Sequence, residues 1–276
     1  MSRTARATDA ILCIIAGGGR VAVFLFMMIP VAVVILMSVN PGATFPPRAI
    51  SLIWYESFLM RPDFRDGLLV SVVLGLCVTA ISVALGTACA FPLARSVFKG
   101  KDLLTVLFLS PLTVPQIITA VALLNLFVLT QVISYRFQVL LVAHTIVAVP
   151  YVIRVVTGSL IGFDRSIEEA SLNLGANYLQ TVTRITLPLI KPGMLAGAFF
   201  AFQASFSNVT VSAFLASGNV TTLPIVLFSW LRFKFDPSLA AISTLLILFT
   251  AGSLLLVERT LGLDKLTGMP TGAQSA

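Results

Sequence analysis

The sequence predicts an all-α integral membrane protein with six transmembrane helices. Of its 276 residues, 58% are hydrophobic and only 11% are charged, whereas a soluble domain carries about a quarter charged residues. The mean hydropathy is +1.01. The apolar residues form continuous runs of the length that crosses a bilayer, about 20 residues. They do not form the short alternating segments of a transmembrane β-barrel, which is therefore excluded.

Six apolar runs give the expected domain organisation. A transmembrane domain over 21–257 follows an N-terminal segment, 1–20, and precedes a C-terminal tail, 258–276. This arrangement leaves no room for a soluble catalytic domain. The expected spans are 21–39, 67–93, 103–129, 139–156, 192–215 and 239–257.

The positive charges predict the orientation. Placing both termini in the cytoplasm puts twelve of the 18 Lys and Arg residues on the inner side, as the positive-inside rule requires. The net charge of +7 is then a property of the inner loops, and we expect no nucleic-acid partner. In the outer loop, residues 50–60 carry Trp54, Tyr55 and Phe58 and predict a short helix at the lipid interface.

The connection 157–191 is long for a helical bundle and contains two helix signals. Ser166 followed by Glu169 fits a capping box, and Gly175 stands where a left-handed C-cap residue is expected. A second short helix is expected from about Asn177 until Pro188 stops it. Such a short helix either docks in a groove of another protein or packs under the membrane bundle, and the pattern leaves both open.

This loop resembles a known family. Glu169-Ala170-Ser171, Gly175 and the segment Ile185-Thr186-Leu187-Pro188 are similar to the EAA loop of permease subunits of bacterial ATP-binding-cassette (ABC) importers. That signature is Glu-Ala-Ala, three residues, Gly, nine residues, and Ile-x-Leu-Pro. Six of the seven fixed positions match, and Ser171 replaces the second Ala.

The wider chain is similar to one branch of that family, the spermidine/putrescine-type permeases, and among them to the second, PotC-like subunit. Looser matches carry this resemblance: Trp54-Tyr55 with Phe58-Leu59, the prolines of Ser110–Pro115, and Thr222-Leu223-Pro224. The resemblance implies a type I ABC importer permease fold in the bacterial inner membrane. It also implies four kinds of partner: two copies of an ABC ATPase, a second permease, an extracytoplasmic solute-binding protein and membrane lipid. The second permease is either a homologue or a second copy of this chain, and the branch favours a homologue.

The resemblance also assigns the loop residues. The EAA loop would form a coupling helix seated in a groove of the ATPase, so the expected coupling residues are Glu169, Ala170, Ser171, Gly175, Ile185, Leu187 and Pro188. The sequence contains no Gly-rich phosphate loop with Lys-Ser/Thr. We therefore expect no catalytic site and no bound cofactor in this chain, with ATP and Mg used by the ATPase.

The expected substrate path is less specific. Ser207 and Asn208 are polar residues within the fifth span, and Gln116 and Thr119 share a face of the third. Polar groups within the membrane are costly and often functional, although small polar residues also join helices. Polyamine permeases commonly carry acidic residues, which suit a cationic cargo, where Ser207 and Asn208 stand here. Their absence weakens a polyamine assignment, so a polyamine-like, an amino-acid-derived or another small organic ion all remain open as the cargo.

Two alternatives remain at this stage. A stand-alone secondary transporter or channel would have charges buried within its spans, and the expected spans are almost free of them. A membrane scaffold would leave the EAA spacing unexplained. The single histidine, His144, fits an interhelical hydrogen bond better than a proton relay. No Cys/His cluster suggests a metal site.

Overall fold

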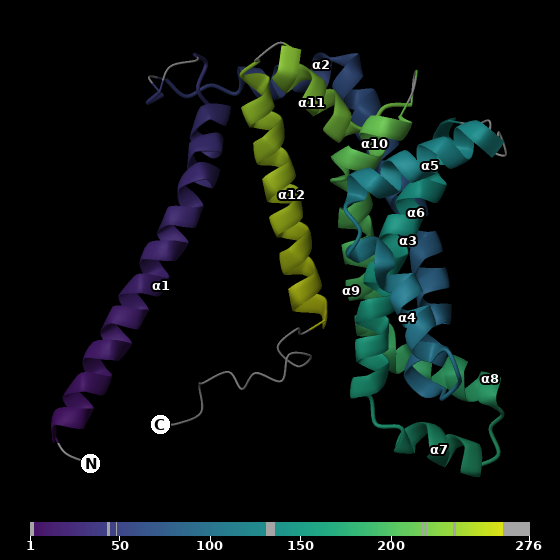
Figure 1. Ribbon diagram of the computed structural model, residues 1–276. Coiled ribbons are helices and arrows are strands. Elements are labelled where there is room, and N and C mark those ends of the chain that lie inside the picture. Colours follow the sequence, from purple (N-terminus) through teal and green to yellow (C-terminus); the bar gives the residue numbers. More distant parts are fainter. Residues whose placement is uncertain are drawn as a thin grey trace. The chain divides into compact units, whose positions relative to one another are not determined.

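The computed structural model describes residues 3–42, 45–47, 49–130, 136–216, 218, 220–233 and 236–261. Within these residues all regular secondary structure is helical. The helices are α1 (Arg3–Ser38), α2 (Ile53–Met60), α3 (Pro62–Arg95), α4 (Lys101–Leu109), α5 (Gln116–Thr130), α6 (Arg136–Gly162), α7 (Ser166–Asn173), α8 (Tyr178–Thr181), α9 (Leu187–Phe206), α10 (Val209–Leu215), α11 (Leu223–Phe233) and α12 (Ser238–Leu261), with short turns η1 (Ser110–Leu112) and η2 (Val182–Thr186) (Figure 1).

The chain divides into two compact units. The smaller unit contains α1, α2 and the part of α12 up to Leu248. The larger unit contains α3 to α11, up to Arg232, together with the rest of α12.

Five helical segments of the described chain are long and apolar enough to cross a membrane: Gly17–Ser38, Pro62–Arg95, Arg136–Gly162, Tyr178–Phe206 and Ser238–Arg259. A sixth is divided in two. Lys101–Leu112 and Gln116–Thr130 meet at an angle of 98°, so the span expected over 103–129 is interrupted by a sharp bend. Pro111 and Pro115 explain the break, because proline removes a backbone donor and its ring clashes with the preceding turn.

The fifth predicted span, 192–215, also differs from the structure. Its helix begins earlier, at Tyr178, and ends at Phe206, and α10 follows as a separate helix. Pro188 does not stop the second loop helix. Instead, η2 is a wider π-type turn in which the Leu187 N–H donates to the Val182 carbonyl. Because this turn shifts the hydrogen bonding by one residue directly before Pro188, the helix continues although Pro188 has no N–H to donate.

In the smaller unit, α2 is anchored beside the end of α1. The Trp54 indole N–H donates to the Asn40 carbonyl at 2.7 Å, and the Tyr55 hydroxyl donates to Ser38 Oγ at 2.7 Å. An ion pair of 2.9 Å joins Arg61 to Asp236. The short helix expected over 50–60 is thus present as α2.

In the larger unit, α3, α6 and α9 pack against one another and enclose the core. The three helices approach closely around Val152 of α6. A Cβ added at Gly86 of α3 would lie 2.7 Å from Val152 Cβ, and one at Gly197 of α9 would lie 3.3 Å from Val152 Cα. Small residues allow such approach, which is how helices gain packing energy where no hydrophobic effect drives them together.

Gly86→Ala should therefore lower the free energy of unfolding by about 1–2 kcal/mol, because the added methyl group must push α3 away from α6. The midpoint of thermal unfolding in detergent measures this. Gly158→Ala in α6 is the matched control, since nothing lies within 4 Å of its added Cβ. Equal stability of the two variants would contradict the close packing at Val152.

Candidate functional site

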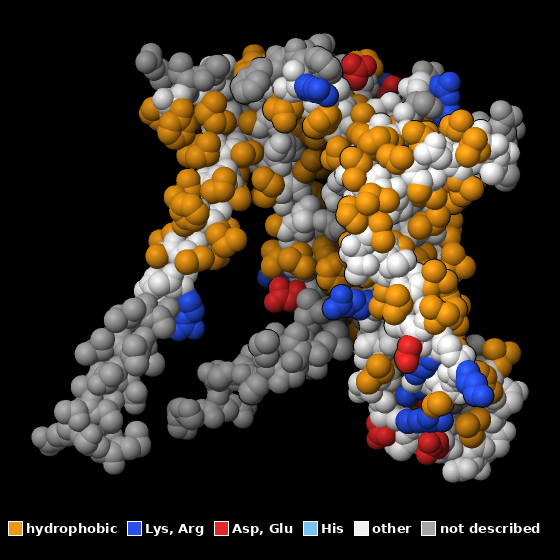
Figure 2. All heavy atoms as spheres, viewed as in Figure 1, with side chains coloured by type: hydrophobic (Ala, Val, Ile, Leu, Met, Phe, Trp, Pro, Cys, Tyr) orange, Lys and Arg blue, Asp and Glu red, His pale blue; other side chains and the backbone are white. Residues whose placement is uncertain are grey.

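The loop between α6 and α9 lies at one end of the α3/α6/α9 bundle, and α5 and α10 lie at the other (Figure 1). It consists of α7, a turn and α8. Lys, Arg, Asp and Glu side chains gather around this loop, whereas hydrophobic side chains dominate the bundle beside it (Figure 2). The loop is therefore an ordered polar structure at the end of an apolar bundle.

The start of α7 differs from the expected capping box. Ser166 is already the first helical residue, and the structure gives its side chain no capping bond to Glu169. Instead, the Ser166 N–H donates to Asp164 Oδ1 at 2.9 Å. That hydrogen bond holds the pKa of the Asp164 carboxyl below its ordinary value. A capping box does occur at the next helix, between Asn177 and Gln180, at the start that the sequence predicted.

The turn after α7 is a Schellman motif centred on Gly175. The Ala176 N–H donates to the Ser171 carbonyl at 3.2 Å, and the Gly175 N–H donates to the Leu172 carbonyl at 3.0 Å, which is the bonding pattern of that motif. Gly175 has a φ of +90°, a region that other residues enter at a cost. The predicted role of Gly175 as the left-handed C-cap residue is confirmed. Nothing lies within 4 Å of a Cβ added there, so a side chain at this position would point into open space.

The small residues of α7 do not share one face. Ser171 is buried, and its hydroxyl lies 3.1 Å from the Thr181 hydroxyl of α8, so it joins the two helices of the loop. Ala170 and Glu169 are exposed, and Glu169 forms only a 3.4 Å ion pair with Arg165 within the helix. Apolar side chains continue this exposed surface, with Leu174 at 89% and Leu179 at 70% exposure.

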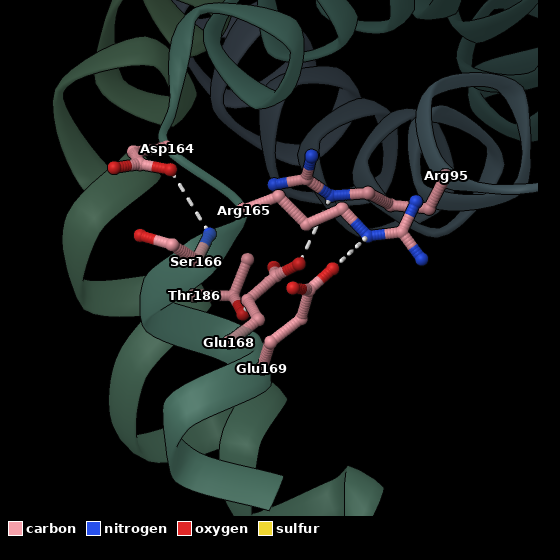
Figure 3. Close-up of polar contacts among 7 residues, drawn as sticks. All are labelled: Arg95, Asp164, Arg165, Ser166, Glu168, Glu169 and Thr186. Atoms are coloured by element: carbon pink, nitrogen blue, oxygen red, sulfur yellow. Dashed lines mark hydrogen bonds and ion pairs between the residues drawn. The ribbon is translucent and has the colours of Figure 1, made fainter.

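Glu168 connects α7 to two other elements, and sequence reasoning missed it (Figure 3). Its Oε1 accepts a hydrogen bond of 2.8 Å from the Thr186 hydroxyl at the end of η2. Its Oε2 lies 3.2 Å from Nε of Arg95, the last residue of α3. The only signal in the sequence was a carboxylate beside the EAA residues and a basic residue at the end of the second span. A pocket of about 310 Å³ opens beside this pair, and Glu169, Tyr178 and Thr186 contribute to its lining.

The remaining predicted coupling residues lie on the way back to the bundle. Ile185 is part of η2, and Leu187 and Pro188 begin α9. Leu187 packs against the core cluster of the bundle, and Pro188 is exposed. These residues therefore join the loop to α9 and are not on the exposed surface of α7.

The predicted substrate-path residues Ser207 and Asn208 lie at the break between α9 and α10. Asn208 is buried, and its Oδ1 accepts from the Val211 N–H at 2.8 Å, so its side chain caps α10. Ser207 is exposed and its hydroxyl donates to the Gln203 carbonyl at 2.6 Å.

The other two predicted path residues, Gln116 and Thr119, are half-buried on α5. α5 packs against α10, the helix that Asn208 caps. The structure thus brings the two helices of the expected path together at the end of the bundle opposite α7 (Figure 1).

His144 spans the same break. It is buried on α6, with Nδ1 3.0 Å from Ser205 Oγ of α9 and Nε2 3.1 Å from Ser212 Oγ of α10. The predicted interhelical hydrogen bond of His144 is confirmed, and there are two. One imidazole therefore holds both sides of the break in position.

His144→Ala should lower the free energy of unfolding by about 1–2 kcal/mol, because two interhelical hydrogen bonds are lost within the membrane. Thermal unfolding of the detergent-purified chain measures this. His144→Gln keeps a donor and an acceptor and should recover part of the loss. An alanine variant as stable as the native chain would contradict the bridging role.

Comparisons with known proteins point to one family. A family model described as "Binding-protein-dependent transport system inner membrane component" matches residues 82–260. The chain is 31% identical over 231 residues to the putrescine transport system permease protein PotI of Escherichia coli strain K12, covering 81% of this chain and 82% of the relative. It is 28% identical over 239 residues to the spermidine/putrescine transport system permease protein PotC of Haemophilus influenzae, with coverages of 86% and 92%. A probable molybdenum ABC transporter permease protein of Haloferax volcanii is 33% identical over 197 residues, with coverages of 68% and 72%.

Solved structures support the same fold. A bacterial ABC transporter involved in the import of the acidic polysaccharide alginate superposes with a TM-score of 0.69 at 16% identity, covering 94% of this chain and 98% of that one. An inward-facing MetNI methionine ABC transporter gives a TM-score of 0.57 at 18% identity, with coverages of 76% and 97%. These likenesses confirm the predicted fold class.

Proposed function

This chain belongs to the binding-protein-dependent transport system inner membrane component family and is a transmembrane permease subunit of an ABC importer, and we propose that α7 is the helix through which an ATPase subunit drives it. Family membership removes the stand-alone secondary transporter and the scaffold as alternatives. The proposal assigns α7 to docking, one of the two roles that the sequence left open.

The observation that carries this proposal is the exposed surface of the loop. Leu174, Leu179 and Tyr178 are 89%, 70% and 65% exposed, in a loop where charged side chains gather (Figure 2). Exposed apolar side chains rimmed by polar ones are typical of protein–protein contact sites. We infer that the ATPase covers these residues, and that one of its side chains enters the pocket beside Glu169.

The partners follow from the family. We propose that two ATPase copies serve this chain and a homologous second permease, and that an extracytoplasmic binding protein delivers the cargo. ATP and Mg would be bound by the ATPase, so this chain would hold no catalytic site. Closure of the ATPases would move α7 and with it the bundle, which would then alternate between inward- and outward-open states.

The α7 end of the bundle is proposed to face the cytoplasm of a bacterial cell, with both termini on that side. Six basic residues support this, because they lie at this end of their helices or in the loop: Arg95, Lys99, Lys101, Arg165, Arg184 and Lys191. Positive charge concentrates in cytoplasmic loops. The break at Ser207–Asn208 would then lie toward the outer side, where cargo arrives.

The proposed cargo is a small organic ion, and a polyamine is the first to test. The relatives PotI and PotC are named for putrescine and spermidine transport. Ser207 and Asn208 are neutral, however, so these two positions offer a polar rather than an acidic path. The binding protein would then supply most of the selection between charged cargoes.

Gly175→Arg should abolish co-purification of the ATPase and lower cellular uptake of radiolabelled putrescine by about tenfold or more. The arginine would point into the space that the ATPase fills, and a charged side chain without a partner is costly in an interface. Affinity purification in mild detergent with mass spectrometry measures the association.

Gly175→Asn is the matched control, because asparagine enters the left-handed region more readily than other residues and its side chain is short. It should keep the ATPase bound. Retention of the ATPase by the arginine variant would overturn docking at α7. If the native chain retains the ATPase but cells do not take up putrescine, only the proposed cargo is overturned.

A further inference from the structure

Glu168 joins the coupling helix α7 to a transmembrane helix that is far from it in the sequence. We propose that the Arg95–Glu168 contact makes α3 follow α7 during the transport cycle, so that Arg95 is a positioning residue of the importer. This inference rests on the proposed docking of an ATPase on α7. The step concerned is the transmission of a displacement of α7 to the helices of the bundle.

Two adjacent glutamates have different surroundings. Glu169 is 63% exposed and pairs only with Arg165 of its own helix, which leaves it accessible to a partner. Glu168 is 14% exposed, and its two oxygens contact Thr186 and Arg95 in two other elements. Both carboxylates extend toward the guanidinium groups of Arg95 and Arg165 (Figure 3), but only that of Glu168 contacts the bundle, whereas that of Glu169 stays exposed.

Arg95 is largely buried at the contact. Its side chain is 15% exposed, and its guanidinium lies 5.5 Å from the ring centroid of Phe163, in the segment that enters α7. A cation at the last residue of α3 is also favoured by the helix dipole. Reduced exposure to water strengthens the attraction between the two charges. The pair is therefore unlike an exposed salt bridge, which contributes little.

The contact supplies a connection that the chain itself does not. Covalently, α7 continues from α6 through residues 163–165 and leads to α9 through α8 and η2. α3 has no such short connection to α7 along the chain. The side chain of Glu168 reaches α3 through Arg95, and reaches the start of α9 through Thr186.

A displacement of α7 therefore reaches all three helices that form the core. Because α3, α6 and α9 are closely packed around Val152, they can move as one body if each is attached to α7. Loss of the Arg95–Glu168 contact would leave α6 and α9 attached to α7 and would release the end of α3 at Arg95, beyond its close packing at Gly86.

Spin-label distances on the full importer complex test this step without knowledge of the cargo. In a background without the three native cysteines, labels are placed at Ala88, exposed on α3, and at Ser166, exposed at the start of α7. The complex is purified with its ATPase and measured without nucleotide and with ATP and vanadate. With Arg95 and Glu168 both native, we expect one narrow distance between the two labels, which is the same in both states.

Glu168→Gln should add a second separation in the ATP–vanadate state, while ATP hydrolysis stays within about twofold of native, since a change along a coupling route alters the coupling between sites without touching the nucleotide site. The glutamine keeps an oxygen that can accept from Thr186, so the local fold is retained. The reversed pair, Arg95→Glu with Glu168→Arg, should restore the single separation. Asp102→Asn, which removes an exposed carboxylate on α4, is the matched control and should behave as native.

A single unchanged separation in Glu168→Gln would overturn the inference, and so would a native separation that changes with ATP. Loss of ATPase binding and hydrolysis in Glu168→Gln would assign the pair a purely structural role. A native chain that purifies without an ATPase would instead overturn the proposed docking at α7, and the link to α3 would fall with it.

Discussion

Water is absent from the hydrocarbon core of a membrane, so every backbone N–H and C=O there must find its partner within the protein. The rest of this structure depends on that constraint. It makes the chain helical, and it restricts the breaks in helices to places where other groups replace the missing bonds. At Ser207–Asn208 the Asn208 side chain caps α10, and His144 bonds to a serine on each side of the break.

Outside the membrane the constraint is relaxed, and side chains determine the form of the loop. The Schellman turn at Gly175, the Asn177–Gln180 capping box and the Ser171–Thr181 hydrogen bond together order the residues between α6 and α9. This order matters for a proposed coupling element. A flexible loop would absorb the motion of a partner, whereas a loop held by its own hydrogen bonds passes that motion on.

Local patterns in the sequence predicted much of this. Apolar runs located the long helices, and the EAA spacing located the loop and the role of Gly175, because each depends on residues close together in the chain. One failure has an equally local cause. Ser166 was expected to cap α7, but it is already the first residue of the helix, and its backbone N–H donates to the Asp164 side chain. The Arg95–Glu168 pair could not be predicted, because it depends on the tertiary packing that brings α3 beside the loop.

The positions of Glu168 and Glu169 show why a motif match is an incomplete guide to mechanism. The signature includes Glu169, which is exposed and has a partner only within its own helix. It omits Glu168, which is half-buried against Arg95 and Thr186. A coupling helix needs both kinds of contact, because force must enter from the ATPase and leave toward the spans. Adjacent residues on a helix point about 100° apart, so two consecutive glutamates can serve the two directions.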